Sequence, residues 1–562
     1  MHQKGIKLLC TVAALACIAS LFSACGGSAG ESTASSGTTP AASTSQPAQE
    51  AAADDGQVGN VYREGLPIVK EPETFRTVVS INPYLKTPAK DLTMWQELGS
   101  RTNLYFEFEE IPASNYNEKV NLLISSNDLP DVFLRSIKDI TEKHYINGQF
   151  MALDDLIEEW APNYAQVLSN PVIRANISAM DGKLYTTPHG INSPWLEVNQ
   201  QMFLNTEWLE ALGLSMPTTL EEYKDVLTAF KTQDPNGNGL ADELPLVMRM
   251  DRNNNMLLPF FGNFGLAIDQ DYAMLDGTTY VLGPQRQEFR DGLEYIHTLY
   301  AEGLFDPENL TQGMAEMQAK GSGEHQLIGS LIGFWADDYC TGEGTLAYDS
   351  IPVFTGREGA PTWIKNPNIP TAEGMTIPTT CKNPQALIRF ADYIIESAYR
   401  TFEVNYGPEE LGLITTTAEG PLHLNSDKAP EGLTFEEWCR QTTIRDMIPF
   451  VVLPDQVLQG RTVDLAPQRK LAYMEKYMDV ITYDVLTPGH TRYYESEDKK
   501  QLATTIWTDL LPLIENFVAQ SIINGVTDES WDSFQNTLKS AKVDQYLEIR
   551  QLALDHYFDT VG

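Results

Sequence analysis

The sequence FRTVVSI at residues 75–81 and the four segments that follow it set the fold. The first segment is rich in β-branched residues, DLTMWQELGS at 91–100 has apolar residues at helical spacing, and LYFEFEEI at 104–111 alternates apolar and polar residues. Residues 115–125 return to helical spacing, and LPDVFL at 129–134 is typical of a short buried strand. This alternation predicts an α/β lobe whose helices pack on a largely parallel sheet.

The chain has 562 residues, enough for more than one such lobe. One domain for each ~100 to 200 residues gives two lobes or more after residue 57. Helical periodicity increases downstream. The expected helices there span 219–232, 286–302, 384–399, 468–477, 499–523 and 531–557.

The charge balance excludes whole classes of partner. The chain carries 77 acidic residues against 39 Lys and Arg, a formal net charge of −38 at pH 7. Such a charge repels nucleic acid and anionic lipid surfaces. No segment after the N-terminus is apolar enough to cross a bilayer. We therefore expect no nucleic-acid partner, and membrane contact only through a lipid anchor.

The first 25 residues are typical of a bacterial lipoprotein signal. A basic start precedes an uncharged apolar run at 8–21, which is shorter than the ~20 residues of a transmembrane helix. Small residues then stand directly before Cys25, and LFSAC at 21–25 is similar to a lipoprotein cleavage box. We expect residues 1–24 to be the signal peptide and Cys25 to carry lipid such as palmitate. An ordinary secretory signal is the alternative.

Residues 25–57 are expected to form a disordered tether behind the lipidated cysteine. They are mostly Gly, Ser, Ala, Thr, Gln and Pro, a composition that cannot bury enough apolar surface to fold. The protein would then stand at the extracellular face of the cell membrane. Beyond the tether, Cys340, Cys381 and Cys439 allow at most one disulfide, and no Cys-x-x-Cys or Cys/His cluster indicates zinc or redox chemistry.

The sequence DPNGNGLADELP at 234–245 has the spacing of a calcium loop. Oxygen side chains occupy positions 1, 3 and 5, a glycine at position 6 permits a sharp turn, and position 7 would offer its backbone carbonyl. Pro245 stands at position 12, where an EF-hand has a bidentate Glu, so a standard sensor hand is excluded. The alternative is a solvated turn without metal, because Asp, Asn and Gly also favour plain turns. The candidate ligands are Asp234, Asn236, Asn238, Leu240, Asp242 and Glu243.

Several phrases in a shared order resemble family 1 extracellular solute-binding proteins, which serve sugar-importing ABC transporters. The phrases are NYNEKVNL at 115–122, SNDLPD at 126–131, WLEALGL at 208–214, the loop at 234–245, GLFDPE at 303–308 and KNPQA at 382–386. The resemblance runs from about residue 75 to the C-terminus. It implies a saccharide ligand, the permease subunits of an ABC importer as partners and a monomeric protein. It also implies that the loop at 234–245 holds a structural calcium ion, as in oligosaccharide-binding members.

The fold that the resemblance implies is a two-lobed periplasmic-binding-protein-like α/β fold of type II, with parallel-rich sheets flanked by helices and a ligand cleft between the lobes. Crossings between lobes would lie at 184–188, at 374–378 and after about residue 410. Lobe 1 would comprise 58–186 plus about 376–450, and lobe 2 would comprise 187–375 plus about 451–562.

Sugars stack on aromatic rings and hydrogen-bond to carboxylates and amides, so the cleft should hold both kinds of side chain. Each candidate could equally be a core aromatic or a surface carboxylate. Members of this family commonly have Arg before the helix that begins at Trp208, whereas this chain has NTE at 205–207, and a neutral saccharide is therefore expected. The candidates are Asn82, Tyr84, Trp195, Trp335 with Asp337 and Asp338, Trp363 and Tyr406.

Two other function classes stay open at this point. A surface glycoside hydrolase would need a pair of carboxylates, and nothing singles out a pair among so many. The Gly-x-Ser-x-Gly, His-Glu-x-x-His and P-loop patterns are absent from the sequence. A binder or sensor of another solute, such as a peptide, is the second alternative. We expect a binding protein and no enzyme.

Overall fold

A computed structural model divides the chain into two compact units, residues 1–55 and 56–562. The expected signal peptide, Cys25 and nearly all of the tether lie outside the described residues, and no described helix has the length and apolar character needed to span a membrane. The structure describes residues 57–561 apart from 136–140, 142–143, 192–199, 252–253, 323–325, 335, 337–338, 341–346, 353, 355–362, 365–368, 417–421, 426–427, 432, 434, 453–471, 473–475, 477–480, 483–485 and 487.

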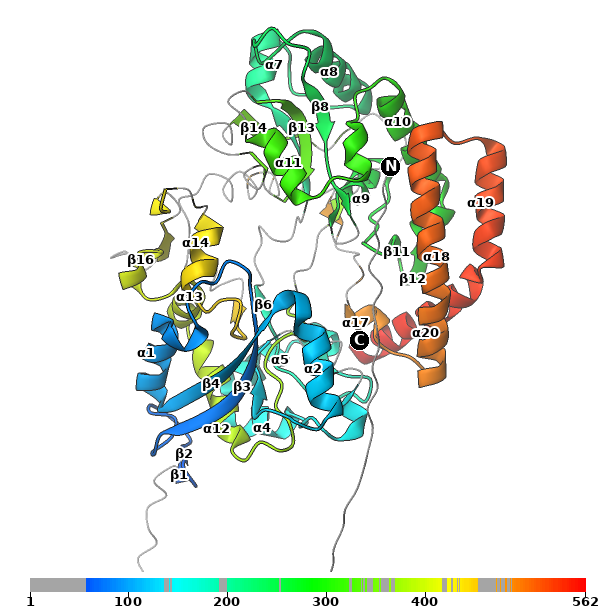
Figure 1. The fold of residues 1–562 in the computed structure, drawn as a ribbon. Helices are drawn as coiled ribbons and strands as arrows, with labels where there is room; N and C mark the ends of the chain where they lie inside the picture. Colours follow the sequence, from blue (N-terminus) through cyan, green and yellow to red (C-terminus); the bar gives the residue numbers. More distant parts are fainter. Residues whose placement is uncertain are drawn as a thin grey trace, which may run out of the picture. The chain divides into compact units, whose positions relative to one another are not determined.

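The N-terminal pattern forms a three-stranded parallel sheet in the order β4-β3-β5 (Figure 1). The central strand β3 (Glu73–Ile81) pairs along its whole length with β4 (Leu104–Pro112) and, on its other side, with β5 (Val132–Phe133). Helices α1 (Thr93–Thr102) and α2 (Tyr116–Ser125) connect the strands. The strand and helix order predicted from residues 75–134 is confirmed.

Apolar residues cover both faces of this sheet because successive side chains of a strand point to opposite sides. Val79 of β3 belongs to the large cluster on one face, and Val78 belongs to a smaller cluster with α2 on the other. The large cluster also holds Trp95, whose ring lies 6.3 Å from that of Phe390. The helices that contribute to it are α4 (Asp154–Trp160), α5 (Pro162–Leu168), α6 (Pro171–Ile177), α12 (Pro384–Ile394) and α13 (Ala398–Tyr406).

A second sheet, with its own apolar core, has the strand order β14-β7-β13-β8. Its strands are β7 (Gln201–Asn205), β8 (Leu244–Val247), β13 (Ile328–Gly333) and β14 (Tyr348–Ser350). β13 runs parallel to β8, but β7 runs antiparallel to both β13 and β14. The expected parallel-rich arrangement therefore holds for the first sheet, whereas the second is mixed. Apolar spacing marks a strand without giving its direction.

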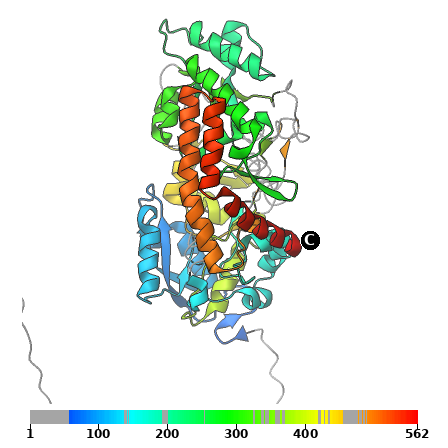
Figure 2. The same cartoon turned by 90° about the vertical axis from the view of Figure 1, so that its right-hand side faces the viewer.

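Helices surround the second core. The long helix α18 (Glu497–Asn524) lies beside α19 (Asp528–Ser540) and contributes buried residues that include Leu510 and Ile514 (Figure 2). Its neighbours include α10 (Gln287–Ala301) and α20 (Val543–Val561). Other helices of this core are α7 (Thr206–Leu212), α8 (Leu220–Thr232), α9 (Leu257–Phe260) and α11 (Met314–Gly321).

Two of the expected helices are each broken into two. The helix expected at 384–399 ends at Ile394, and α13 starts afresh where Ser397 Oγ accepts a hydrogen bond from Arg400 N at 3.2 Å. The helix expected at 531–557 is interrupted at Lys542, which has a left-handed φ of 65°. In both places the apolar spacing continues across the break, so periodicity alone could not locate it. The expected helix at 468–477 falls almost wholly outside the described residues.

The remaining regular elements are short. They are β1 (Gln57–Val58), β2 (Val61–Tyr62), β6 (Gly190–Ile191), β9 (Met250–Asp251), β10 (Asn254–Asn255), β11 (Ala273–Asp276), β12 (Thr279–Leu282), β15 (Trp363–Ile364), β16 (Ile414–Thr416), β17 (Leu422–Leu424), α14 (Phe435–Thr442), β18 (Val451–Val452), β19 (Ile481–Thr482) and α17 (Pro488–Thr491).

Three segments that are distant in sequence meet at His189. The backbone of His189 exchanges hydrogen bonds with Thr371, at 2.9 and 2.8 Å. One residue on, Gly190 N donates to Phe450 O at 3.0 Å, and β6 then pairs in parallel with β18. Thr187 likewise pairs with the segment around Met375. Each of these segments lies in the chain between residues of the first core and residues of the second.

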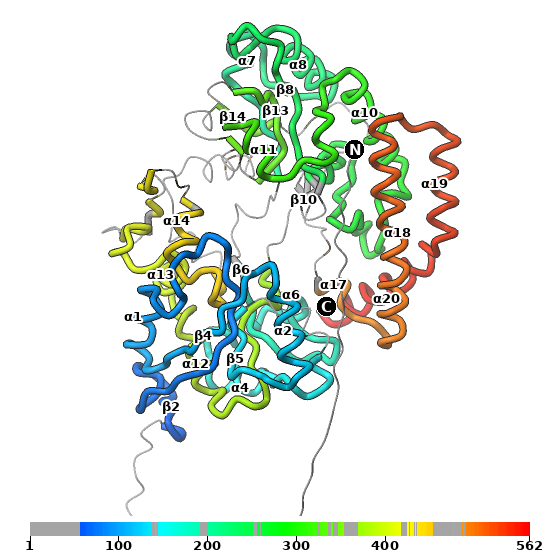
Figure 3. Tube along the Cα trace, viewed as in Figure 1, coloured from blue at the N-terminus to red at the C-terminus, as the bar shows by residue number. Residues whose placement is uncertain are grey.

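Asn176 at the end of α6 adds a side-chain link to this junction. Its side chain is buried, its Nδ2 donates to Pro370 O at 2.8 Å, and its Oδ1 accepts from Gly489 N at 2.8 Å. The α17 turn that begins there lies beside both α6 and α20, as the trace in Figure 3 shows. One amide group therefore joins α6, the 370 segment and α17.

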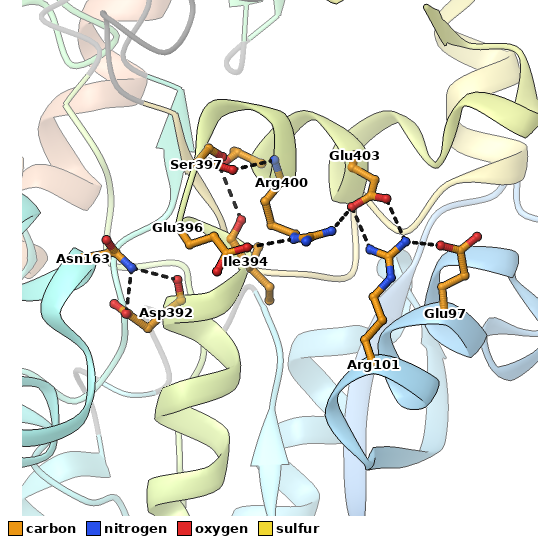
Figure 4. A network of polar contacts seen from close by, with 10 residues as sticks. Glu97, Arg101, Asn163, Asp392, Ile394, Glu396, Ser397, Arg400 and Glu403 are labelled. Atoms are coloured by element: carbon orange, nitrogen blue, oxygen red, sulfur yellow. Dashed lines mark hydrogen bonds and ion pairs between the residues drawn. The ribbon is translucent and has the colours of Figure 1, made fainter. Parts of the chain in front are cut away.

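A buried ionic network fixes α13 against α1 (Figure 4). Glu403, whose side chain is 3% exposed, accepts hydrogen bonds from Arg101 Nη1 and Nη2 at 2.9 Å each and also pairs with Arg400. Arg101 pairs in addition with Glu97. These hydrogen bonds hold the guanidinium groups in place and raise the pKa of Arg101.

The three cysteines beyond the tether, Cys340, Cys381 and Cys439, are buried free thiols, and no disulfide joins them.

The close approach at Gly374 gives a test of the junction. A Cβ at this position would lie 2.2 Å from Thr187 O, a backbone atom that cannot move aside without breaking the pairing. We expect Gly374→Ala to lower the free energy of unfolding by about 1–3 kcal/mol or more, as overpacking does. Urea unfolding of a protein that begins at residue 58, referred to below as the soluble body, measures this free energy.

The matched control is Gly313→Ala, where the nearest atom is the flexible Oε2 of Glu316 at 3.0 Å. It should change stability by less than Gly374→Ala. Equal effects of the two variants would contradict the assignment of a tight backbone approach at Gly374.

Candidate functional site

The carboxyl-terminal edge of the first sheet carries a group of polar side chains. Asn82 and Tyr84 follow β3, and Arg135 lies two residues after the end of β5. Ligands of open α/β sheets bind beyond the carboxyl ends of parallel strands. Residues 440–446, which run from the last turn of α14 into the segment before β18, lie against the same edge, since Asn82 and Arg135 both bond to them.

Asn82 organises this edge through both ends of its amide. Its Nδ2 donates to Asp446 Oδ2 at 2.8 Å and to Arg440 O at 3.3 Å. Its Oδ1 accepts from the backbone N–H groups of Tyr84 and Leu85 at 2.9 and 3.0 Å. The ring of Tyr84 is 39% exposed and lies under the guanidinium of Arg440, 5.9 Å from it. The amide thus fixes the turn that presents Tyr84.

Tyr406 belongs to an aromatic strip beside the same segment. Its ring stacks at 5.9 Å on Phe402 and at 6.2 Å on Phe435, which in turn meets Trp438 edge to face at 6.1 Å. The guanidinium of Arg445 lies 5.6 Å from the Tyr406 ring. Tyr406, Phe435 and Trp438 are all partly exposed, so the strip offers apolar ring surface next to charged groups.

Arg135 is the central cation of the group. It is half-buried, and its Nη1 donates to Arg445 O at 3.2 Å. Burial lowers its pKa, while the nearby carboxylates of Asp446 and Glu373 act in the opposite direction. Tyr116 donates to the backbone carbonyl of Arg135 at 2.8 Å and so fixes the chain at this point.

The structure thus brings Asn82, Tyr84 and Tyr406 of the sequence prediction together around residues 440–446. Sequence reasoning missed Arg135 and Asp446. Arg135 could have been found, because it directly follows the buried run at 129–134. No sequence signal pointed to Asp446, since its place depends on a segment more than 300 residues away that folds back onto the sheet.

Of the other predicted cleft residues, the structure describes only the backbone of Trp363. Trp195, Trp335, Asp337 and Asp338 lie outside the described residues. The backbone of Trp363 forms β15 and pairs in parallel with β19.

His189 joins the three segments that pair around residues 189, 371 and 450, and it lies beside the polar group. Its Nδ1 accepts a hydrogen bond from Phe450 N at 3.2 Å, so this nitrogen carries no proton. The ring meets that of Phe450 edge to face at 4.7 Å. Burial, and secondarily the positive charge of Arg135, hold the pKa of His189 well below its ordinary value of 6.5. The junction therefore requires a neutral imidazole.

This geometry predicts a pH dependence. The unfolded chain takes up a proton at His189 near pH 6.5, but the folded protein does so only at lower pH. The His189 contribution to stability should be complete above pH 6.5 and should be lost as the pH falls toward the lower folded-state pKa. Urea unfolding of wild type and His189→Gln between pH 8 and pH 5 measures the difference.

The free-energy gap between wild type and His189→Gln should narrow as the pH falls. His556→Gln, at an exposed position on α20, is the control and should leave the wild-type pH profile unchanged. Parallel profiles for wild type and His189→Gln would contradict the assigned role.

The loop at 234–245 folds tightly between α8 and β8. Asp234 Oδ2 accepts from Gly239 N at 3.1 Å, and Asn238 Oδ1 accepts from Leu240 N at 2.7 Å. The amide of Asn238 donates to both oxygens of Asp242 at 3.0 and 3.2 Å. Gly239 has a left-handed φ of 76°, the conformation that position 6 of such a loop needs.

Glu243 contributes a buried carboxylate to this loop. Its side chain is buried, and within the described residues its Oε1 has no hydrogen-bond partner. Burial raises the pKa of Glu243, and the carboxylates of Asp234 and Asp242 add to the effect. A cation would remove this cost. In the described part of the chain, no group of three or more His, Cys, Asp or Glu side chains is placed to hold a metal ion. A cation in this loop would therefore also need amide and backbone oxygens as ligands.

A family model described as bacterial extracellular solute-binding protein matches residues 87–401. The fructooligosaccharide ABC transporter substrate-binding protein FusA of Streptococcus pneumoniae is 24% identical over 520 residues, which cover 87% of this chain and 91% of FusA. The polygalacturonan/rhamnogalacturonan-binding protein YtcQ of Bacillus subtilis is 27% identical over 232 residues, 40% of this chain and 43% of YtcQ.

Solved structures show the same fold. FusA in complex with kestose matches with a TM-score of 0.72 at 23% identity, covering 87% of this chain and all of the other. A human-milk-oligosaccharide (HMO) binding solute-binding protein from Bifidobacterium longum infantis matches with a TM-score of 0.75 at 20% identity, over 87% of this chain and 99% of the other. The two-lobed α/β fold expected from the sequence is thereby confirmed. With a family model matched over more than half of its length, the chain belongs to the bacterial extracellular solute-binding protein family.

Proposed function

We propose that this protein captures an extracellular oligosaccharide and delivers it to the permease of an ABC importer. The observation that carries the proposal is the carboxyl-terminal edge of the first sheet. There Asn82, Arg135 and Asp446 provide donors and acceptors beside the partly exposed rings of Tyr84 and Tyr406. Hydroxyl partners next to aromatic faces are what a sugar requires. The saccharide-binding functions of FusA and of the Bifidobacterium protein support the same ligand class.

The lobes of this proposal have the boundaries expected from the sequence: 58–186 plus about 376–450, and 187–375 plus about 451–562. Two separate apolar cores and the three segments that meet at His189 support it. The ligand would bind between the lobes, which close on it by rotation at these segments. Trp195, Trp335, Asp337 and Trp363 remain proposed contributors to the cleft.

We further propose a structural calcium ion in the loop at 234–245. Asp234, Asn236, Asn238, Asp242 and Glu243 would hold it with side-chain oxygens, and Leu240 with its carbonyl. The unsatisfied Glu243 Oε1 supports a cation there. So do two similar solved structures, one of a FusA EF-hand mutant and one of the alginate-binding protein AlgQ2 without calcium ion. The ion would supply positive charge that locks the loop.

The proposed cellular location follows from the N-terminal sequence. A lipid on Cys25 would hold the monomeric receptor at the extracellular face of the cell membrane, and the tether would let it reach its permease. The sequence of residues 1–25 supports this part of the proposal.

Saccharide capture is tested with the soluble body from residue 58. A saturating neutral oligosaccharide at ~100 times its Kd should stabilise the native state by about 2.7 kcal/mol and leave the sugar intact. Thermal unfolding against a saccharide and peptide panel, with an assay for released reducing ends, measures both. Release of reducing ends would indicate a hydrolase, and stabilisation by peptides alone would indicate another solute class.

Tyr406→Ala should weaken binding of the saccharide found in this way about fivefold, because a stacking surface worth ~1 kcal/mol is lost. Tyr399→Ala is the matched control, since Tyr399 lies on the same helix and is 41% exposed. Calorimetric titration measures both Kd values. Equal affinity of the two variants would remove Tyr406 from the site.

Chelation tests the ion. EDTA should lower the melting temperature of the soluble body by several degrees, and Ca²⁺ should restore it. Glu243→Gln should reduce this response strongly, whereas Glu221→Gln, at an exposed site in the first turn of α8, should keep it. A wild-type protein that does not respond to EDTA would contradict the calcium proposal.

A further inference from the structure

Arg135 has hydrogen-bonding capacity that the described protein does not use. Its guanidinium has five N–H donors, of which Nη1 donates to Arg445 O. Its Nε is buried and has no hydrogen-bond partner within the described residues. An unsatisfied buried donor on a charged group is costly, so its retention at the carboxyl edge of a parallel sheet calls for an oxygen that the described chain does not supply.

Acceptor capacity lies next to this donor. Asp446 binds Asn82 Nδ2 through its Oδ2 at 2.8 Å, while its Oδ1 accepts no hydrogen bond from the residues that the structure describes. Asp446 and Glu373 are also the two carboxylates whose charges act on Arg135. The same small region therefore offers a cationic donor and an anionic acceptor.

This combination distinguishes between two kinds of sugar. A hydroxyl group can accept from a guanidinium and donate to a carboxylate at once, and neighbouring hydroxyls can divide these roles. The carboxylate of an acidic sugar can only accept, and it would face Asp446 and Glu373 at close range. The two negative charges thus favour a hydroxyl over a uronate as the ligand group that meets Asp446.

We propose that Arg135 and Asp446 form a donor and acceptor pair that binds two adjacent hydroxyls of a neutral sugar residue. The inference rests on the proposed saccharide-binding function and names the chemistry that the site selects. Arg135 is a specificity-determining residue, held in register by Arg445 O, by the Tyr116 bond to its backbone and by Asn82 behind Asp446. A lysine would keep the charge but lose the planar fork.

The test begins with the neutral oligosaccharide that binds the wild-type soluble body most tightly. Arg135→Lys, Arg135→Gln and Asp446→Asn should each raise its Kd about 10- to 100-fold. The double variant Arg135→Gln with Asp446→Asn should lose less than the product of the single losses, because the pair acts on one ligand group. Circular dichroism and thermal unfolding without sugar establish that each variant is folded.

Arg63→Gln is the matched control. Arg63 lies 4.8 Å from the ring of Trp160 and pairs with Glu159, its side chain is 43% exposed, and it follows β2 rather than a strand of the β4-β3-β5 sheet. Its Kd should equal that of wild type.

The outcomes separate the two proposals. A wild-type protein that binds a neutral sugar, together with Arg135 variants that bind it equally well, overturns this inference and leaves the proposed function intact. A wild type that prefers oligouronates, with binding abolished in Arg135→Gln, shows that Arg135 pairs with a carboxylate and also overturns it. A wild type that binds no saccharide overturns both.

Discussion

The hydrogen bonds that His189 makes to two other segments are the constraint on which the rest of the structure depends. Its backbone pairs with Thr371, and its neutral imidazole accepts from Phe450 N. These contacts bring together three segments, each of which lies in the chain between the first core and the second. The positive charge of Arg135 adds to burial in keeping the imidazole neutral. The polar edge of the first sheet therefore helps to set the protonation state that the junction requires.

That edge combines the features expected of a sugar site with a fixed geometry. Asn82 holds Asp446 and the Tyr84 turn, and Arg445 joins the Tyr406 strip to Arg135. Each of these polar groups is thus oriented by a neighbour that itself makes a defined bond. Preorganisation of this kind reduces the entropy that binding costs.

Much of the fold of the first sheet could be predicted from local sequence. The strands and helices at 75–134 follow from patterns over a dozen residues, and they appear as expected. The break between α12 and α13 could not be predicted, because apolar spacing runs through it and a serine cap decides it. The direction of β7 was equally invisible. Asn82, Tyr84 and Tyr406 were foreseen individually, but their common neighbour Asp446 comes from a segment placed by long-range packing.

The central claim is that two lobes joined at His189 capture a saccharide by closing on it. Small-angle X-ray scattering of the soluble body, with and without a saturating neutral oligosaccharide, tests it most directly. The account predicts a radius of gyration that decreases when the sugar is added and recovers when the sugar is removed by dialysis. A sugar that binds without any change in the radius of gyration would contradict it.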